Sequence, residues 1–403
     1  MIPVGHILGA LAVIATMTIW LEPPYASLVV QAAVLLLAAV VIAKQPISIP
    51  LRWSLLLAAV AAWGPAQLLA GSTEYRYATA ASTLQWVSRA VVFVLACQAL
   101  RLRDPRHHAR TVLAAFGASI AVFAIAQAYT SHGKYFWLFP SGQPEVFGPF
   151  QNRNNYAAFI ELLLPLALWR SFTAGPRRML WLIVSAIMAA SVAASASRAG
   201  SVLVAAELLA VPSISWWQKR MPPGELLLLT SILALVSASA VAITGWSTLL
   251  SRLFDSDPFL YRREILHSAL AMVRERPWAG FGLGTFTTAY PAYATFDSGY
   301  FVNFAHNDWA EWAVEGGVAF LLLLLAIAIP VGLAALRSGW GLGVPAVFLH
   351  GLVDFPMQRP GVSFWLLIVA AAVMVDQQDR VARQRRKPAA YPQSGECHAP
   401  ADS

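Results

Sequence analysis

The 403-residue chain is far more hydrophobic than a soluble protein: 58% of its residues are hydrophobic and only 12% are charged, against about 25% charged in an average soluble domain. This composition excludes a soluble globular protein and predicts an all-α polytopic membrane protein. The net charge of +8 is explained by basic loops that contact anionic lipid. The sequence contains no nucleic-acid-binding motif that would give the charge another role. The two cysteines, Cys97 and Cys397, exclude a disulfide framework.

Apolar segments recur along most of the chain. A membrane span requires about 20 predominantly apolar residues, and the sequence predicts about 12 transmembrane helices within a single transmembrane domain, residues 1–378. The two weakest are 199–214, which is short and contains Glu207, and 341–356, which contains His350 and Asp354. In chain order the runs cover residues 4–20, 25–43, 52–70, 84–100, 112–130, 156–172, 179–196, 199–214, 226–245, 309–336, 341–356 and 361–376.

The distribution of basic residues predicts the orientation of these spans. Lys and Arg concentrate in loops on the cytoplasmic side, and an even number of spans places both termini on one side. If that side is cytoplasmic, more than half of the 28 basic residues fall on inner segments, including RLRDPRHHAR (101–110). We therefore expect both termini to be cytoplasmic, with a basic, disordered tail over residues 379–403.

Two longer segments then lie on the outer face. Residues 131–155 are rich in Pro, Gly and aromatic residues, which predicts an ordered re-entrant or interfacial loop with Trp137 at headgroup depth. Residues 246–308 contain YRREILHSALAMVRERP, whose apolar side chains recur at helical spacing. This spacing predicts an amphipathic helix over 261–276 that lies on the outer face. The glycines of GFGLGTF lack the βαβ setting of a nucleotide-binding loop, so they predict a tight turn.

Arginines at membrane depth are candidates for function, because charge there is costly and usually faces a cavity or a partner. Arg198 lies among small residues in ASASRAGSVLV, where a ligand has room. An arginine at a helix end can instead extend to the interface, so both explanations stay open. Arg89 lies in the fourth apolar run, and the sequence does not reveal its partner.

Four more ionisable residues lie in or beside apolar runs. Glu161 and Glu207 are also candidates for function, and either could pair with a buried arginine. His350 and Asp354 belong to HGLVDFPMQRP, where helix termination before Pro356 explains them as well as chemistry does.

The segment FVNFAHNDWAEW (301–312) places polar residues at the start of a long apolar run. Asn307 and Asp308 are good helix caps, so a solvated helix start is one explanation. Catalysis by His306 is the other explanation, because histidine titrates near neutral pH and is the commonest general base. The eight histidines show no H-E-x-x-H pattern and no pair at metal-ligand spacing, so we expect no metal site and no cofactor.

Five regions between about residues 145 and 360 read, in chain order, FGPFQNRNNYAAFIELLLPLAL, SASRAG, YRREILHSALAMVRERPWAGFGLGTF, AHNDWAEWAVEGGVAF and HGLVDFPMQRP. In this order they resemble the signature regions of the O-antigen ligase and O-antigen polymerase (Wzy-type) superfamily of bacterial inner-membrane glycosyltransferases. The resemblance implies a GT-C-like, metal-independent and inverting enzyme. Such an enzyme transfers a glycan from undecaprenyl diphosphate to an acceptor hydroxyl on the periplasmic face.

The resemblance also implies roles for single residues. Arg198 and Arg262 would hold the donor diphosphate, since a guanidinium is always charged and grips phosphate oxygens in a fork. Arg263 is the alternative to Arg262 if the register shifts by one residue, and His306 would be the catalytic base. Sugar-binding, phosphate-binding or supporting roles would fall to Asn152, Asn154, Arg89, Asn307 and Asp308, with helix capping as the other explanation for the asparagines.

The expected function is therefore the synthesis of a surface polysaccharide, either O-antigen or exopolysaccharide. Polymerases share these sequence motifs with ligases that use lipid A–core as acceptor. The motif variants in this sequence slightly favour a polymerase. The alternative is a transporter or flippase of lipid-linked glycans, which would place charges around a midplane cavity between repeated halves. The expected partners are the lipid-linked donor, the glycan or lipid A–core acceptor and membrane lipid, without nucleic acid.

Overall fold

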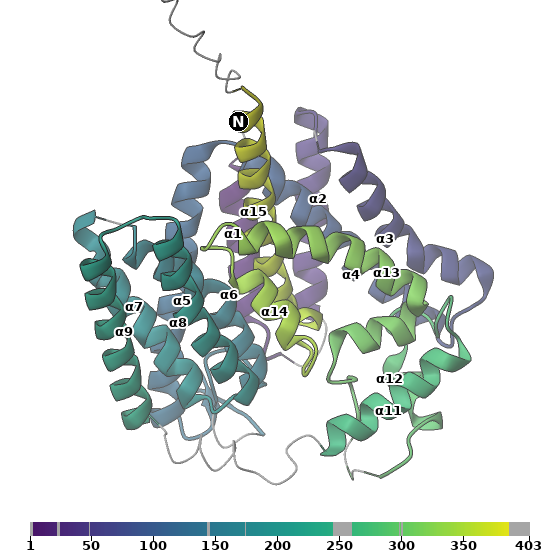
Figure 1. Ribbon diagram of the computed structural model, residues 1–403. Helices are drawn as coiled ribbons and strands as arrows, with labels where there is room; N and C mark the ends of the chain where they lie inside the picture. The colour runs from purple at the N-terminus through teal and green to yellow at the C-terminus, as the bar shows by residue number, and fades with distance from the viewer. Residues whose placement is uncertain are drawn as a thin grey trace, which may run out of the picture.

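Runs of Ala, Leu and Val form long helices that stand side by side in the computed structural model (Figure 1). The structure describes residues 3–21, 25–47, 49–142, 146–173, 175–244, 260–297, 299 and 301–386. The N-terminus and the C-terminal part of α15 lie at one end of the molecule, which we call the tail end (Figure 1). The helices α11 and α12 lie at the opposite end, which we call the loop end.

The elements follow one another in a helical chain with one small hairpin. The first half contains α1 Val4–Met17, α2 Tyr25–Lys44, α3 Leu51–Ala70, α4 Arg76–Ala99, α5 Arg103–Thr130, and the antiparallel strands β1 Lys134–Tyr135 and β2 Phe139–Pro140. The middle contains α6 Arg153–Ser171, η1 Gly175–Arg177, α7 Arg178–Ala194, α8 Arg198–Trp217 and α9 Pro223–Thr244. The last part contains α11 Leu260–Glu275, α12 Phe286–Ala289, η2 Tyr290–Ala292, α13 Asp308–Leu336, α14 Gly343–His350, η3 Pro356–Gln358 and α15 Pro360–Arg386.

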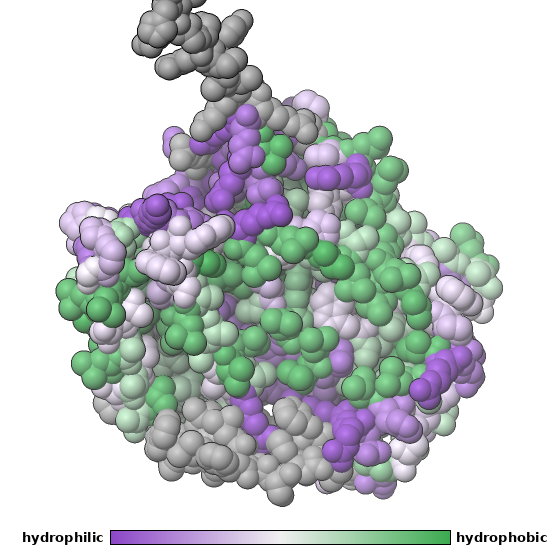
Figure 2. Space-filling view, in the orientation of Figure 1, coloured by the Kyte–Doolittle hydropathy of each residue, from purple (hydrophilic) through white to green (hydrophobic). Residues whose placement is uncertain are grey.

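The expected all-helical multi-pass membrane architecture is confirmed. Eight of the described helices are long and apolar enough to cross a membrane: α2, α3, α4, α5, α7, α8, α13 and α15. The apolar helices α1 and α9 are shorter over their described apolar parts, and α6 is 19 residues long and almost entirely buried. Figure 2 shows hydrophobic side chains across the middle of the molecule and hydrophilic side chains towards both ends, as expected for a protein that spans a membrane.

The run 341–356 does not form a continuous spanning helix. The predicted number of about twelve transmembrane helices is therefore too high. Only the eight residues of α14 form an α-helix there, and at 1.5 Å per residue they extend about 12 Å. The physical reason lies partly in Gly343, which packs directly on the backbone of α6. A Cβ atom there would come within 2.3 Å of the Leu162 carbonyl oxygen. A helix broken at membrane depth is tolerated because protein surrounds it.

The chain still passes from the tail end to the loop end through this broken segment. Near the tail end, Arg380 Nη1 donates to the carbonyl of Arg337 (3.2 Å). At the loop end, the amide of Asp308 donates to the carbonyl of Gly351 (2.8 Å). The start of α1 and the end of α15 lie together at the tail end of the molecule (Figure 1).

The predicted disordered tail is wrong for its first eight residues. α15 continues to Arg386, and ion pairs explain why residues 379–386 are helical. Arg380 pairs with Asp376 one turn earlier (2.9 Å), which supports a helix. Asp379 pairs with Arg106 of α5. The remainder of the predicted tail, including Cys397, lies outside the described residues.

The amphipathic helix predicted over 261–276 is confirmed as α11. It buries Ile265, Ala269 and Met272 against a cluster that includes Val314 of α13. Leu270, one of the apolar side chains of this helix, is 45% exposed and so lies outside the buried stripe. The first part of the predicted outer segment, residues 246–259, lies outside the described residues.

The tight turn predicted for GFGLGTF is also confirmed. Gly280 has a φ of +67°, and a Cβ atom there would lie 2.4 Å from the Glu315 carbonyl oxygen. Gly317 has a φ of +77° and kinks α13. Glycine is needed there because a Cβ atom would lie 2.3 Å from the Trp278 carbonyl oxygen. These glycines allow the loop after α11 to pack backbone to backbone on α13.

The predicted outer loop 131–155 is ordered over its described residues. It forms the hairpin of β1 and β2, and the indole nitrogen of Trp137 donates to Thr130 Oγ1 (2.9 Å). The Trp137 side chain is 41% exposed. The depth of this tryptophan in a bilayer stays a prediction.

Candidate functional site

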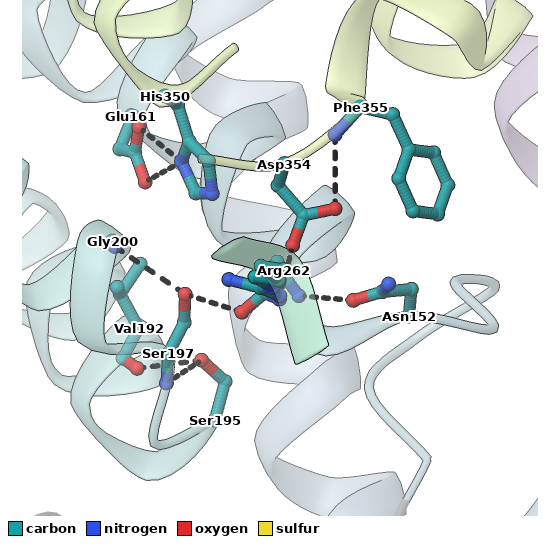
Figure 3. A network of polar contacts seen from close by, with 11 residues as sticks. Asn152, Glu161, Val192, Ser195, Ser197, Gly200, Arg262, His350, Asp354 and Phe355 are labelled. Atoms are coloured by element: carbon teal, nitrogen blue, oxygen red, sulfur yellow. Dashed lines mark hydrogen bonds and ion pairs between the residues drawn. The ribbon is translucent and has the colours of Figure 1, made fainter. Parts of the chain in front are cut away.

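A buried carboxylate, Asp354, stands at the centre of a polar network at the loop end (Figure 3). Its Oδ2 atom accepts hydrogen bonds from Arg262 Nη2 (2.8 Å) and from Asn154 Nδ2. Its Oδ1 atom accepts from the amide of Phe355 (2.9 Å) and lies 3.7 Å from His306 Nδ1. One carboxylate therefore joins side chains from α11, α6 and the segment that precedes α13.

Asp354 lies in the loop after α14, outside the spanning helices, and its surroundings favour the charged form. Burial raises the pKa of a carboxyl group. The nearby imidazole of His306 and the charge of Arg262 outweigh burial and lower the pKa to about 2. A carboxylate that stays ionised at neutral pH can orient an imidazole and stabilise its protonated form.

The backbone and the ring of His306 are both constrained. Its φ is +51°, in the left-handed region that non-glycine residues rarely occupy, and such strain often marks a functional position. The ring packs edge-on against Phe355, with centroids 5.0 Å apart, and Phe355 stacks on Phe304 at 4.2 Å. The His306 side chain is 31% exposed, so it remains accessible to a ligand.

Arg198 begins α8 beside this network. The preceding residue, Ser197, donates from Oγ to Asn154 Oδ1 (2.8 Å) and accepts from the amide of Gly200 as the cap of α8. The sequence suggested that the small residues leave room for a ligand. Instead they bring α8 close to α6, because a Cβ atom at Gly200 would lie 2.5 Å from the Ala157 Cβ atom.

Arg262 and Arg263, the two alternative diphosphate ligands of α11, have different surroundings in the structure. Arg262 joins the network with a side chain that is 29% exposed, whereas Arg263 is exposed on α11. Diphosphate binding by Arg198 and Arg262 stays a prediction, as does catalysis by His306.

The two other asparagines act as helix caps. Asn152 accepts from the amide of Asn154 (2.7 Å) at the start of α6. Asn307 accepts from the amide of Ala310 (3.0 Å) at the start of α13, and its Nδ2 atom donates to the carbonyl of Leu352 (2.9 Å). Capping therefore explains both residues, and Asn307 also ties α13 to the loop that carries Asp354.

Replacing Asn307 with alanine should lower the free energy of unfolding by about 1 kcal/mol, the usual effect of removing a helix cap. Thermal or denaturant unfolding of the purified protein in detergent measures this change. We expect activity to remain within a few-fold of wild type, because Asn307 supports the site without facing it. An unchanged stability would contradict the capping role.

Arg89 and Asp308 support the loop that follows Asp354. Arg89 Nη2 donates to the carbonyls of Met357 (3.1 Å) and Gln358 (3.4 Å), and its guanidinium lies 4.8 Å above the Trp86 ring. The fully buried Asp308 accepts from the amide of Met357 (3.0 Å). Both side chains thus hold the loop in place.

Sequence analysis did not single out Asp354, which it explained equally well by helix termination. The same holds for His350, whose Nδ1 atom lies 3.0 Å from each carboxyl oxygen of Glu161. The sequence left open whether Glu161 pairs with a buried arginine, and its partner in the structure is this histidine. Glu207 is buried too, and its carboxyl oxygens have no hydrogen-bond partner among the described residues. Ionisable side chains inside apolar runs were the available signal.

A polar cleft of about 360 Å³ lies close to the network. Phe304, which stacks on Phe355, forms part of its wall. Carboxylate, amide and hydroxyl groups share the remaining lining with apolar residues; the polar residues include Ser82, Gln85, Thr287, Asn303, Glu311 and Glu315. Within the described parts of the chain, no three His, Cys, Asp or Glu side chains gather as a metal site would require.

The fold and the site define an all-helical, multi-pass membrane protein with a charged polar site at one end. Residues 183–325 match the family described as O-antigen ligase, and this match supports the resemblance to the O-antigen ligase and polymerase superfamily. The matched segment contains Arg198, Arg262 and His306, whereas Asn154 and Asp354 lie outside it. No curated protein matches the chain significantly. The family match supports a glycosyltransferase of the O-antigen ligase or polymerase type in polysaccharide biosynthesis.

Proposed function

We propose that the protein transfers a glycan from undecaprenyl diphosphate to an acceptor hydroxyl, and that its loop end faces the periplasm of a bacterial inner membrane. The observation that carries this proposal is the meeting of His306 and Arg262 on opposite oxygens of Asp354. Glycan transfer from a diphosphate needs a base for the acceptor hydroxyl and a cation for the leaving group within one site. Asp354 holds both groups together.

The proposed reaction is a single displacement. The acceptor oxygen forms a bond to the anomeric carbon while the bond from that carbon to the diphosphate oxygen breaks. His306 takes the proton of the acceptor hydroxyl, and undecaprenyl diphosphate leaves with the bonding electrons. Asp354 stabilises the imidazolium that forms. One displacement inverts the configuration at the anomeric carbon.

Fixed arginines suit the charge of the leaving diphosphate. A guanidinium offers five donors in a planar fork, and Asp354 occupies Nη2 of Arg262 while the side chain remains partly exposed. Arg198 starts α8 at the same network. Cations of this kind stabilise the leaving group without a metal ion, so the proposed mechanism is metal-independent.

The polar cleft supports a glycan as the ligand of this site. Hydroxyl, amide and carboxylate groups are suited to bonding the many hydroxyls of a sugar, and the cleft shares Phe304 with the wall that holds His306 in place. Its volume of about 360 Å³ lies within the range of small-molecule sites, about 300–1,000 Å³.

A reconstituted assay tests the proposal. The full chain is supplied with undecaprenyl-diphosphate repeat units, with and without lipid A–core, and each reaction is repeated with EDTA. A ladder of products from the donor alone identifies a polymerase, which we favour, and product only with lipid A–core identifies a ligase. We expect EDTA to leave the rate unchanged. Activity that requires an added metal would contradict the role given to the arginines.

The second candidate function is transport of the lipid-linked glycan. The broken helix α14 and the buried pair of His350 and Glu161 favour it, because transporters often build sites from interrupted helices near the membrane midplane. The network around Asp354 lies at the loop end instead, which favours transfer. Donor binding without glycan transfer in the assay, together with movement of labelled donor between bilayer leaflets, would establish the transporter.

A further inference from the structure

A second charged cavity, of about 410 Å³, lies at the tail end. Helix α6 extends from the network to this cavity. Asn154 contacts Asp354 near one end of the helix, and Arg170 lines the cavity near the other. Their separation of 16 positions corresponds to about 24 Å along a helix. The cavity is therefore separate from the candidate active site. Its charged lining comprises Arg106, Arg110, Arg170, Arg220, Arg380, Arg383, Asp376 and Asp379.

The positive charges in this cavity exceed the negative ones. Its two carboxylates are taken by the pairs Arg380–Asp376 and Arg106–Asp379. The other four arginines pair with no carboxylate among the described residues, and the buried Nε atom of Arg170 has no hydrogen-bond partner there. Like charges held together repel unless an anion lies between them. The cavity thus has the charge of an anion site.

Tryptophan rings hold several of these arginines in place. The guanidinium of Arg110 lies 4.8 Å above the Trp340 ring, and that of Arg220 lies 4.9 Å above the Trp169 ring. A ring face attracts the cation and leaves the N–H groups at the guanidinium edge directed elsewhere. These arginines are therefore positioned to grip a planar or tetrahedral oxyanion.

We propose that this cavity binds a phosphate group, supplied either by the headgroup of an anionic phospholipid or by a soluble phosphate. The surroundings favour the lipid. Basic pockets between spanning helices bind anionic headgroups, and Leu166 and the two tryptophans provide apolar walls. Beside Arg220, Trp216 and Trp217 at the end of α8 are 63% and 79% exposed, as is usual for tryptophans at a membrane interface.

A bound phosphate would join α5, α6, α15 and the turn after α8 by neutralising charges that otherwise repel. The expected readout is therefore stability as well as binding. Thermal unfolding of the full chain in neutral detergent is followed while phosphatidylglycerol, phosphatidylcholine, inorganic phosphate or pyrophosphate is added at constant ionic strength. Phosphatidylglycerol should raise the unfolding temperature, whereas phosphatidylcholine should not.

The matched variants are R110Q/R170Q within the cavity and R52Q/R177Q outside it. Arg52 also packs on a tryptophan, Trp53, which lies beside α15 near the tail end, and Arg177 is exposed beyond α6. Each removed arginine should weaken binding of phosphatidylglycerol about fivefold, hence roughly 30-fold for the cavity variant. The outer variant should bind as wild type does.

Each outcome bears on the proposal. Equal stabilisation by phosphatidylglycerol and by inorganic phosphate or pyrophosphate would support the site and identify a soluble phosphate as its ligand. No response to any of the four additions, or the same lipid response in the cavity variant as in wild type, would overturn it. If R110Q/R170Q fails to fold, R383Q at the exposed rim should still weaken binding about fivefold. Native mass spectrometry of wild type should then show retained anionic lipid.

Discussion

Replacing His306 with glutamine is expected to lower turnover by about 10²–10⁴-fold, the usual contribution of a general base, while binding of the lipid-linked donor stays within a few-fold of wild type. Glutamine is polar and similar in size, but it cannot accept the proton of the acceptor hydroxyl. Single-turnover transfer with the donor pre-bound measures the chemical step, and a separate binding assay measures the affinity for the donor.

The neighbouring residue provides the control for this variant. Asn307→Ala removes the cap of α13 next to His306, so it should lower stability and leave turnover close to wild type. If H306Q and N307A both lower stability and leave turnover unchanged, the histidine is structural. If H306Q loses donor binding as strongly as turnover, His306 binds the donor instead of accepting a proton.

The helical elements were largely predictable because their signals are local. α11 begins and ends within one residue of the predicted 261–276, since helical spacing and Pro277 mark it in sequence. α4 and α5 begin eight or nine residues before their apolar runs, because their first turns carry Arg and other polar residues that a hydropathy window rejects. A helix accepts such residues where it extends beyond the hydrocarbon core.

α14 was over-predicted for the opposite reason. A hydropathy window averages over 341–356 and does not register that Gly343 must touch the carbonyls of α6. The break depends on contact with a helix some 180 positions earlier in the sequence. Packing of this kind is invisible in the local sequence, even when the glycines that permit it are visible.

The residues of the candidate site also differ in how far the sequence predicts them. His306 and Arg262 carry chemistry that is evident from residue type and from their resemblance to family motifs. Asp354 takes its role from Asn154, Arg262 and His306, three partners at distant positions, so the sequence alone left it indistinguishable from a helix terminator. Its burial could be anticipated, but its position between the base and the cation could not.

Arg262→Gln is expected to lower the rate of transfer by about 10²–10³-fold, the usual effect of removing one group that stabilises developing negative charge. Arg263→Gln is the matched control, because it removes the same charge from the next residue of α11, where the side chain is exposed. It should reduce transfer by no more than a few-fold. The opposite ranking would move the diphosphate site to Arg263, and no loss in either variant would contradict diphosphate binding by α11.

Because Arg262 also pairs with Asp354, R262Q could act through the carboxylate rather than through the donor. R262K separates the two effects: lysine keeps the positive charge beside Asp354 but lacks the fork that grips two phosphate oxygens. A diphosphate role predicts that R262K retains the stability of wild type yet binds the donor more weakly and transfers it more slowly. If R262K restores transfer fully, the charge next to Asp354 is the whole contribution of Arg262, and Arg198 becomes the principal cation for the leaving group.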